Sequence, residues 1–473
     1  MGRWPAPWPT SVHLIGVGGV AMSSLAVLLA RRGVSVTGSD RDVYPPASEL
    51  LARAGIEPRT PYSPSNLPSR PDLVIVGNAV SPGNEELDAV LERDWPLASM
   101  AEVVERLLVP GRRPLVVAGT HGKTTTASLL AWLLHDGGRD PSFLVGGLPG
   151  NFDCGSRLGG GPDLVLEGDE YDTAFFDKGP KFLHYWPRIA VLGTVEFDHA
   201  DIYRDADEVT RAFSWLVRLV PRDGTLVYDA DDAAAARLAA AARCRRIAVG
   251  LAADADLSLA DREDRSGGQR FTVLAGGKPA GAVRLALPGV HNAKNALAAL
   301  AAARAAGLPL ERALASLPRF RPPRRRMERV GEGRGVVVYD DFAHHPTAVR
   351  LTLEAARSLV PAGGRLVACL EPRSNTMVRA IVRAPLEDAL SRADRVVLGP
   401  VDRPERFAPE ERLDVASLAA GLRSRGVPAD GPLPPERIAD LLLGELAPGD
   451  RVVVMSNGGF GGLARRLVER LRG

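Results

Sequence analysis

Short apolar runs alternate with helix-like segments along most of the chain, and this alternation restricts the fold more than any other feature. From residue 12 the order is VHLIGVG, a helical segment, VSVTGSD, a second helical segment and DLVIVGN. Apolar runs of this length, separated by helical segments, are typical of parallel sheets with helical crossovers. We therefore predict an α/β protein.

Two breaks in this alternation divide the 473 residues into three units. The breaks are GRRP at 111–114 and the proline- and arginine-rich FRPPRRRMERV at 320–330. We predict domains at residues 1–110, 111–325 and 326–473. The outer two are Rossmann-like, and the central one has a mainly parallel sheet with a small β region at 255–287, where helical periodicity is lost.

Composition excludes several classes of function. The net charge is only +2, which gives no global field for nucleic acid or an anionic membrane. Three distant cysteines, Cys154, Cys244 and Cys369, contain no CxxC pair and fit a reducing compartment. The N-terminus has no apolar leader, and no uncharged apolar run reaches about 18 residues. We expect a cytoplasmic protein without a signal peptide or membrane insertion.

The stretch VVAGTHGKTTTASLL at 116–130 predicts a phosphate-binding loop. A strand that leads through glycines into a helix directs backbone N–H groups and the helix dipole at one anion. The loop is shorter than usual, because two residues rather than four separate its glycines. Lysine occurs at only five positions, so a lysine in this loop indicates a phosphate ligand. The predicted ATP-binding residues here are Gly119, Thr120, His121, Gly122, Lys123, Thr124 and Thr125.

Acidic segments follow two neighbouring apolar runs. We expect Thr124 to bind Mg²⁺ through its hydroxyl and Glu167, in DLVLEGDEYD, to supply a second oxygen ligand. A solvated acidic loop is the alternative reading of EGDEYD. The segment VEFDHADIY repeats the arrangement, and its His199 is expected near the metal and the phosphates.

Weaker motifs suggest further binding residues. GVGGVA and the end of the second strand could hold NAD, FAD or a UDP-sugar, or form a turn without a ligand; the residues are Gly16, Gly18, Gly19, Ser39 and Asp40. HNAKN provides amides for a helix cap or a purine edge; the residues are His291, Asn292 and Asn295.

YDDFAHHP suggests nucleotide contacts through Asp340 and His344. EPRSNTM is either a polar turn or a carboxylate site of Arg373, Ser374 and Asn375.

Five of these motifs, GTHGKTT, EGDEYD, FDHAD, HNAKN and YDDFAHHP, occur in an order that resembles the Mur ligase family along essentially the whole chain. The resemblance implies UDP-sugar binding by the first domain, with Asn151 contributing, ATP and Mg²⁺ in the second, and amino-acceptor binding in the third. It implies an ADP-forming amide ligase that acts through an acyl phosphate. Lys123, His199 and Arg326 are the expected catalytic residues, with Arg326 acting on the γ-phosphate of ATP.

Two activities of that family compete. One joins UDP-N-acetylmuramate to L-alanine during peptidoglycan synthesis, and the other joins it to the recycled tripeptide L-Ala-γ-D-Glu-meso-diaminopimelate. Stretches such as GGLPGNFD, EYDTAFFDK and EPRSNTM resemble the second, which would give Arg373, Ser374 and Asn375 a tripeptide to recognise. The carbamylated lysine of several family members has no counterpart, since residues 200–277 contain no lysine. His199 with carboxylates would then position any second metal.

Two other classes remain open at this point. An NAD-dependent oxidoreductase would use GVGGVA and Asp40 but would leave the phosphate loop unexplained. A nucleotide-gated binding protein would bind ATP without catalysis. The expected partners are small-molecule substrates, with no nucleic acid, and the chain is expected to be a monomer or homodimer.

Overall fold

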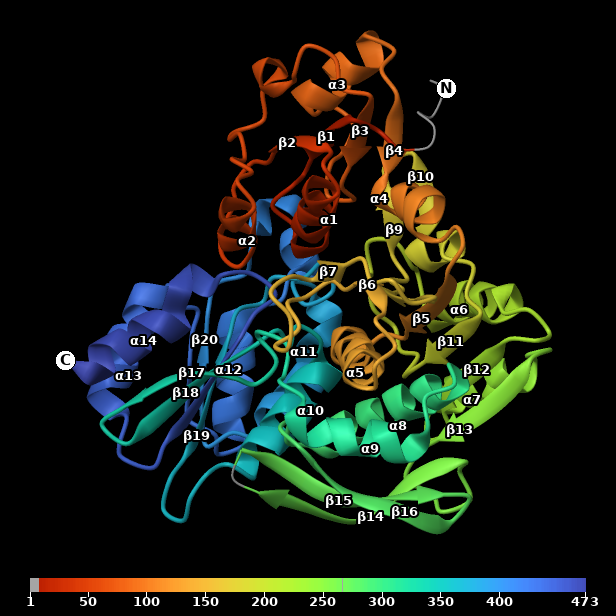
Figure 1. Cartoon of the computed structure of the whole chain (residues 1–473). Coiled ribbons are helices and arrows are strands. Elements are labelled where there is room, and N and C mark those ends of the chain that lie inside the picture. Colours follow the sequence, from red (N-terminus) through yellow and green to blue (C-terminus); the bar gives the residue numbers. More distant parts are fainter. Residues whose placement is uncertain (1–7, 266) are drawn as a thin grey trace.

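The computed structural model describes residues 8–265 and 267–473 and contains three main sheets, one for each expected unit. Figure 1 shows the N-terminal unit at the top, the central unit below it at the right, and the C-terminal unit at the left. Residues 1–7, where the sequence predicts no signal peptide, lie outside the described residues. In the part of the chain that is described, no helix is long and apolar enough to cross a bilayer.

The N-terminal sheet is parallel and has the order β2-β1-β3-β4. Its strands are β1 (Ser11–Ile15), β2 (Ser35–Ser39), β3 (Leu73–Val76) and β4 (Leu97–Ser99). The connecting helices are α1 (Val20–Arg31), α2 (Ala47–Arg53), α3 (Glu85–Glu92) and α4 (Met100–Val103). The alternation predicted from the sequence is confirmed here, and the glycine loop between β1 and α1 lies at the carboxyl edge of the sheet.

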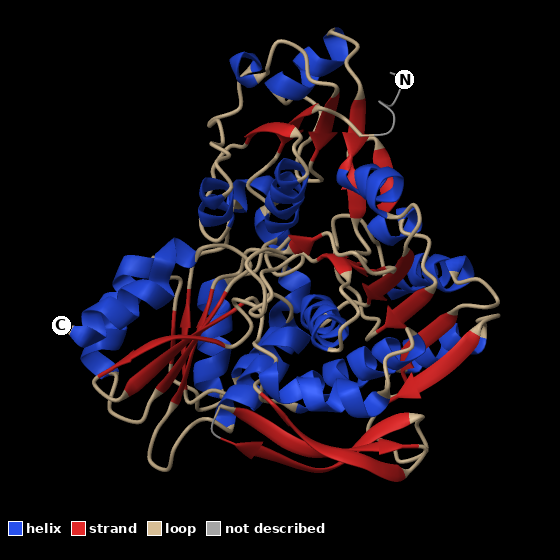
Figure 2. Ribbon diagram, viewed as in Figure 1, coloured by secondary structure: helices blue, strands red, loops and turns tan. Residues whose placement is uncertain are grey.

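The central sheet has ten strands in the order β16-β15-β14-β13-β12-β11-β5-β8-β6-β7. Its parallel part contains β5 (Arg113–Ala118), β6 (Ser142–Leu144), β8 (Asp163–Glu167), β11 (Ile189–Leu192), β12 (Thr225–Asp229) and β13 (Arg245–Val249). The predicted β region is the antiparallel extension β14 (Leu257–Arg265), β15 (Gly268–Ala275) and β16 (Lys278–Leu285). It continues the main sheet, at the bottom of Figure 2, rather than forming a separate one. A two-residue strand, β7 (Ser156–Arg157), ends the other edge.

Helices cover this sheet and fix the phosphate loop. They are α5 (Lys123–Asp136), α6 (Ala206–Leu219), α7 (Ala233–Ala240), α8 (Val290–Ala305) and α9 (Leu310–Ser316). The leucines of α5, including Leu130, are fully buried. They belong to the same hydrophobic core as the alanines of α8. Because alanine side chains are small, α8 can pack closely along α5. The helix that follows the phosphate loop is therefore held on several sides.

The C-terminal sheet has the order β17-β18-β22-β19-β20-β21, and only the β17–β18 pair is antiparallel. Its strands are β17 (Glu328–Gly333), β18 (Val336–Asp341), β19 (Leu366–Leu370), β20 (Arg395–Leu398), β21 (Ala429–Asp430) and β22 (Arg451–Met455). The helices are α10 (Pro346–Arg357), α11 (Arg383–Leu390), α12 (Val415–Ser424), α13 (Pro435–Glu445) and α14 (Leu463–Arg472). A small hairpin of β9 (Asp172–Ala174) and β10 (Asp177–Pro180) reaches from the central unit towards the N-terminal one.

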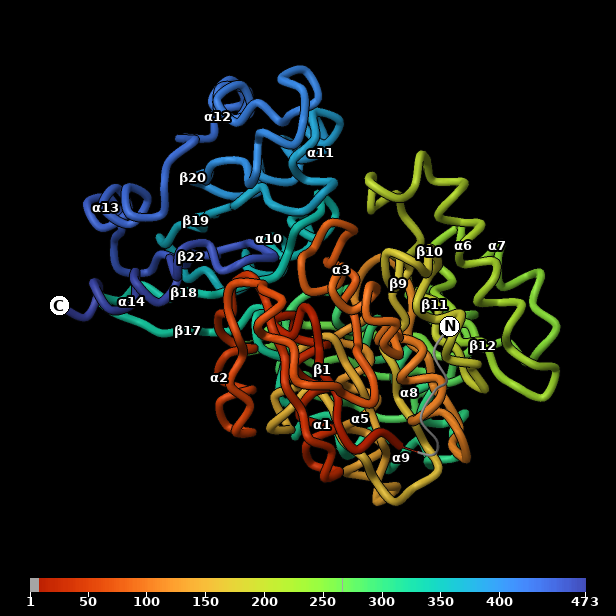
Figure 3. Tube along the Cα trace, turned by 90° about the horizontal axis from the view of Figure 1, so that it is seen from above, coloured from red at the N-terminus to blue at the C-terminus, as the bar shows by residue number. Residues whose placement is uncertain are grey.

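The N-terminal unit contacts both of the others. Arg31 pairs with Asp153 of the central unit at 2.7 Å, and Ser156 Oγ donates to the carbonyl of Ser24 at 2.6 Å. Glu49 accepts from Arg465 of the C-terminal unit at 3.5 Å. In the view from above, the red N-terminal trace lies over the central unit and beside the C-terminal one (Figure 3). The loops of the three units therefore face a common space.

We predict that Leu130→Ala lowers the free energy of unfolding by about 2–5 kcal/mol, because it leaves a cavity between α5 and the sheet. Leu251→Ala, in the same unit, is the matched control, because that leucine is 46% exposed. It should change the free energy by no more than about 0.5 kcal/mol. Urea unfolding followed by circular dichroism measures both, and equal midpoints for the two variants would contradict this account of the core.

Candidate active site

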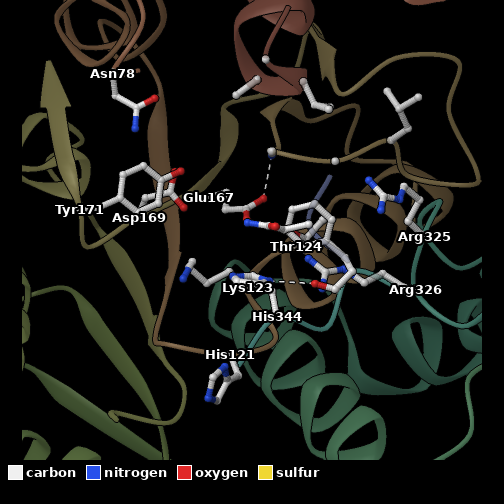
Figure 4. Close-up of a pocket in the computed structure, with 18 of the residues that line it drawn as sticks. Asn78, His121, Lys123, Thr124, Glu167, Asp169, Tyr171, Arg325, Arg326 and His344 are labelled. Atoms are coloured by element: carbon white, nitrogen blue, oxygen red, sulfur yellow. Dashed lines mark hydrogen bonds between the residues drawn. The ribbon is translucent and has the colours of Figure 1, made fainter. Parts of the chain in front are cut away.

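Loops from all three units line one cleft of about 480 Å³. The N-terminal unit contributes Gly18, Gly19, Tyr44 and Asn78, and the C-terminal unit contributes Phe342, His344 and Asn457. Between them lie the phosphate loop and the acidic end of β8 (Figure 4). A ligand of the first unit and a phosphate on the second would thus share one cleft.

The phosphate loop has the backbone that its glycines permit. Gly122 starts α5 in the left-handed region (φ 77°), and Gly119 also has positive φ (129°). A Cβ on Gly122 would lie 2.4 Å from Asn295 Oδ1, and one on Gly119 would lie 2.9 Å from the backbone N of Gly193. Both positions therefore require glycine for conformation and for space. Thr120 fastens the loop, since its N–H donates to the carbonyl of Thr194 at 2.7 Å.

Lys123 is held above this loop by a buried carboxylate. Its Nζ lies 2.8 Å from Glu170 Oε2 and 2.8 Å from the carbonyl of Gly119. Burial alone would lower the pKa of Lys123, but Glu170 and Asp169 outweigh it and raise the pKa. The ammonium is therefore charged at neutral pH, at the point where a nucleotide's terminal phosphates would meet the loop.

Thr124 and Glu167 form a compact oxygen pair at the same place. The Thr124 hydroxyl donates to Glu167 Oε1 at 2.8 Å, and the Gly146 N–H donates to Oε2 at 2.7 Å. Burial and the nearby Asp169 raise the pKa of Glu167, so its charge lacks full compensation. A divalent cation between these hard oxygens would supply it, and the pair fits Mg²⁺ on that ground.

Arg326 reaches the phosphate loop from the start of the C-terminal unit. Its Nη2 donates to Thr124 Oγ1 at 3.1 Å, and its guanidinium lies over the ring of Phe342, 5.1 Å from the centroid. Glu167 and Arg326, which are distant in sequence from Lys123 and Thr124, thus lie beside them in the structure (Figure 4).

His199 contacts the same carboxylate as Lys123 and also lines the cleft. Its Nε2 is 3.2 Å from Glu170 Oε1, and its backbone has a positive φ of 53°, which is uncommon for a residue other than glycine. Burial would lower the pKa of His199, but Glu170 and Asp198 outweigh it and raise the pKa. Glu170, rather than Glu167, is therefore the carboxylate in direct contact with His199.

The sequence motifs did not identify a second lysine in the cleft. Lys181 Nζ lies 2.8 Å from Asp169 Oδ2, 3.1 Å from Tyr171 Oη and 4.2 Å from the centre of the Tyr171 ring. The Tyr171 hydroxyl donates to Asp169 at 2.7 Å. The rarity of lysine in this chain was the available signal for Lys181. Tyr171 and Asn78 also line the cleft, and no pattern in the sequence singles out their side chains.

Of the residues predicted to bind the UDP-sugar, some line the cleft and others bond to protein groups. Gly18 and Gly19 line the cleft, and Asp40 accepts the Gly18 N–H at 2.7 Å, which braces the glycine loop. Gly16 begins that loop with φ 88°. Ser39 is fully buried and bonded to Glu86, and Asn151 accepts the Arg321 N–H at 2.7 Å. The structure therefore directs Ser39 and Asn151 to protein partners, while the glycines remain at the cleft.

The residues of HNAKN lie at the start of α8, behind the phosphate loop. Asn292 donates to the carbonyl of Pro288 at 2.8 Å, and Asn295 donates to Asn292 Oδ1 at 3.2 Å beside Gly122. Burial lowers the pKa of His291 to about 4. Thr125 is buried in the first turn of α5.

The C-terminal residues separate into two groups. Burial lowers the pKa of His344, which lines the cleft, to about 4. Asp340 pairs instead with Arg325 at 3.2 Å, outside this cleft, and burial raises its pKa to about 6. Ser374 donates to the carbonyl of His344 at 3.0 Å, and Asn375 donates to Asp201 of the central unit at 2.8 Å.

Arg373 lies near two carboxylates, 3.7 Å from Asp402 and 4.0 Å from Glu371. Its guanidinium passes so close to Gly458 that a Cβ there would lie 2.4 Å from Nε. The absence of a side chain on Gly458 therefore leaves the space that Arg373 occupies.

Comparison with known proteins agrees with this architecture. Three models match: "Mur ligase family, catalytic domain" at residues 11–110, "Mur ligase middle domain" at 117–303 and "Mur ligase, glutamate ligase domain" at 325–458. The chain is 41% identical to the UDP-N-acetylmuramate–L-alanyl-γ-D-glutamyl-meso-2,6-diaminoheptandioate ligase of Escherichia coli K12, over 97% of this chain and 98% of that one. It is 42% identical to the UDP-N-acetylmuramate–L-alanine ligase of Kineococcus radiotolerans, over 82% and 80% of the two chains.

A solved structure, that of a murein peptide ligase from Psychrobacter arcticus, matches with a TM-score of 0.75 and 33% identity over 98% of both chains. The oxidoreductase reading of GVGGVA has no support from these matches. The chain belongs to the Mur ligase family.

Proposed function

We propose that the chain is an ATP-dependent ligase that joins the carboxylate of UDP-N-acetylmuramate to the recycled tripeptide L-Ala-γ-D-Glu-meso-diaminopimelate. The observation that carries this proposal is the single cleft in which the glycine loop of the N-terminal unit faces the phosphate loop. The E. coli relative that is named for this activity matches over nearly the whole of both chains. UDP-N-acetylmuramate–L-alanine ligation is the alternative, because such a relative is also similar.

The proposed roles follow the three units: residues 1–110 bind the UDP-sugar, 111–325 bind ATP and 326–473 bind the amino acceptor. A carboxylate oxygen of the sugar attacks the γ-phosphorus of ATP, and the bond to the β-phosphate oxygen breaks to give ADP and an acyl phosphate. The acceptor amine then attacks the acyl carbon, loses a proton, and inorganic phosphate leaves. We place the reaction in the cytoplasm, because ATP and UDP-sugars are cytoplasmic metabolites.

The protein contributes charge and alignment to this reaction. Lys123 and Arg326 neutralise the phosphate oxygens, as phosphoryl transfer requires. Thr124 and Glu167 would hold Mg²⁺, which would supply further positive charge to the phosphates. We place Arg373, Ser374 and Asn375 beside the acceptor, because this segment adjoins His344 and the central unit.

Acceptor-dependent phosphate release tests the proposal. With ATP, Mg²⁺ and UDP-N-acetylmuramate present, the tripeptide should stimulate phosphate release well above the rate without acceptor, and the same concentration of L-alanine should not. A stronger response to L-alanine would select the alternative ligase, and no response to either acceptor would remove both.

Lys123→Ala should reduce amide formation by at least about 10²-fold, because a donor that stabilises transition-state charge is lost. Binding of UDP-N-acetylmuramate, measured by calorimetry, should change by only a few fold. Lys178→Ala is the control, since Lys178 is exposed and pairs with Asp172 at 2.8 Å. Loss of sugar binding in a folded Lys123→Ala protein would count against the assignment of the sugar to the N-terminal unit.

Glu167→Gln should raise the Mg²⁺ concentration needed for half-maximal activity, because a neutral amide is a weaker ligand for a hard dication. Excess Mg²⁺ should recover part of the rate. Glu263→Gln, at an exposed position, serves as the matched control. An unchanged Mg²⁺ titration for Glu167→Gln would exclude that carboxylate as a metal ligand.

A further inference from the structure

Two histidines and a glutamate meet where the central and C-terminal units touch, apart from Thr124, Glu167 and His199. His121 belongs to the phosphate loop, Glu196 follows β11, and His345 precedes α10. One nitrogen of each imidazole and one oxygen of Glu196 all lie within 4.8 Å of one another. Figure 4 shows the His121 ring directed away from the other labelled residues of the cleft. His121, which the sequence predicts to bind ATP, and His345 also line the cleft, but the reaction steps above give the three residues no role.

The separations suit a small tetrahedral ion. His121 Nε2 is 3.1 Å and His345 Nδ1 is 3.8 Å from Glu196 Oε2. Ligand atoms around tetrahedral Zn²⁺, with bonds of about 2.0–2.1 Å, are about 3.3 Å apart. The two observed distances lie on either side of that value, so small rotations of the side chains would complete the geometry.

Hydrogen bonds from surrounding groups orient His345 and Glu196 so that both can bind a metal ion. The carbonyl of Phe197 accepts from His345 Nε2 at 3.1 Å, which leaves a lone pair on Nδ1. That lone pair otherwise accepts a long bond of 3.3 Å from the Thr347 N–H. The Thr347 hydroxyl donates to Glu196 Oε2 at 2.7 Å and fixes the carboxylate.

Protonation also favours coordination at neutral pH. Burial and the nearby His121 lower the pKa of His345, so its imidazole is neutral. Burial would raise the pKa of Glu196, but hydrogen bonds from His121 and Thr347 outweigh it and lower the pKa to about 2. Metal ions bind neutral imidazole and ionised carboxylate, which are the forms of His345 and Glu196 at neutral pH.

We propose that His121, Glu196 and His345 bind a divalent transition-metal ion such as Zn²⁺, with water as the fourth ligand, and that this ion fastens the C-terminal unit to the central one. Two imidazoles with one carboxylate favour Zn²⁺ or Co²⁺ over Mg²⁺, which prefers octahedral oxygen coordination. Because the ligands come from two units, the ion binds the closed arrangement more tightly than an open one and shifts the population towards it.

Titration with Co²⁺ tests the site in the full chain without ATP or UDP-sugar, so its outcome does not depend on ligase activity. Saturating Mg²⁺ is present to occupy the oxygen-rich sites. One equivalent of Co²⁺ should give the visible absorption of a four-coordinate ion, and one equivalent of Zn²⁺ should abolish it. The absence of this absorption would overturn the proposal.

Variants locate the site. Glu196→Gln and His345→Gln should each weaken Co²⁺ binding by at least tenfold, with folding checked by circular dichroism. His184→Gln is the matched control, because His184 also contacts two carboxylates, Glu105 and Asp177, but through opposite ring nitrogens. Unchanged Co²⁺ affinity in both site variants, or equal loss in the control, would place the ion elsewhere.

Small-angle scattering tests the effect on domain arrangement. Zn²⁺ should reduce the radius of gyration of the wild-type chain, or narrow its distance distribution, and should leave both in Glu196→Gln unchanged. The same response in that variant, or none in the wild type that binds Co²⁺, would overturn the bridging role of the ion.

Discussion

The site depends on the balance between buried carboxylates and two ammonium groups. Asp169 and Glu170 lie within the protein beside Glu167, and an unpaired buried charge is strongly destabilising. Lys123 compensates Glu170, and Lys181 compensates Asp169, each at 2.8 Å. Glu167 accepts hydrogen bonds from neutral donors, the Thr124 hydroxyl and the Gly146 N–H. The same charge arrangement therefore keeps the segment folded and leaves a place for a cation beside the phosphate loop.

The end of the strand β11 connects this charge cluster to the C-terminal unit. Asp198, next to the His199 that contacts Glu170, accepts the Thr376 hydroxyl at 2.6 Å. Asp201 accepts from Asn375 at 2.8 Å. One short segment therefore contacts both Glu170 and the C-terminal unit. His199 is only a few covalent bonds from the contacts that join the central and C-terminal units.

Local patterns in the sequence predict much of the fold, because strand and helix periodicity and turn glycines depend on nearby residues. They predict the alternation around β1 and β5, and the neighbourhood of Thr124 and Glu167 follows from parallel strands ending at one edge. They could not reveal that Ser39 is buried against Glu86, or that Lys181 meets Asp169 across a hairpin. Those contacts, like Arg326 on Thr124, depend on tertiary packing, which has no periodic signature.

The two partners of Glu170 explain how Lys123 can serve a nucleotide without leaving a buried anion unpaired. In the present arrangement Lys123 and His199 both contact this carboxylate, at 2.8 and 3.2 Å. In the proposed reaction Lys123 neutralises phosphate oxygens, which would weaken its contact with Glu170, whereas His199 can keep its own contact with that carboxylate. The contact with Glu170 raises the pKa of His199, which favours the protonated imidazole beside the carboxylate. His199 reaches Glu170 from a left-handed backbone, which is uncommon for a residue other than glycine.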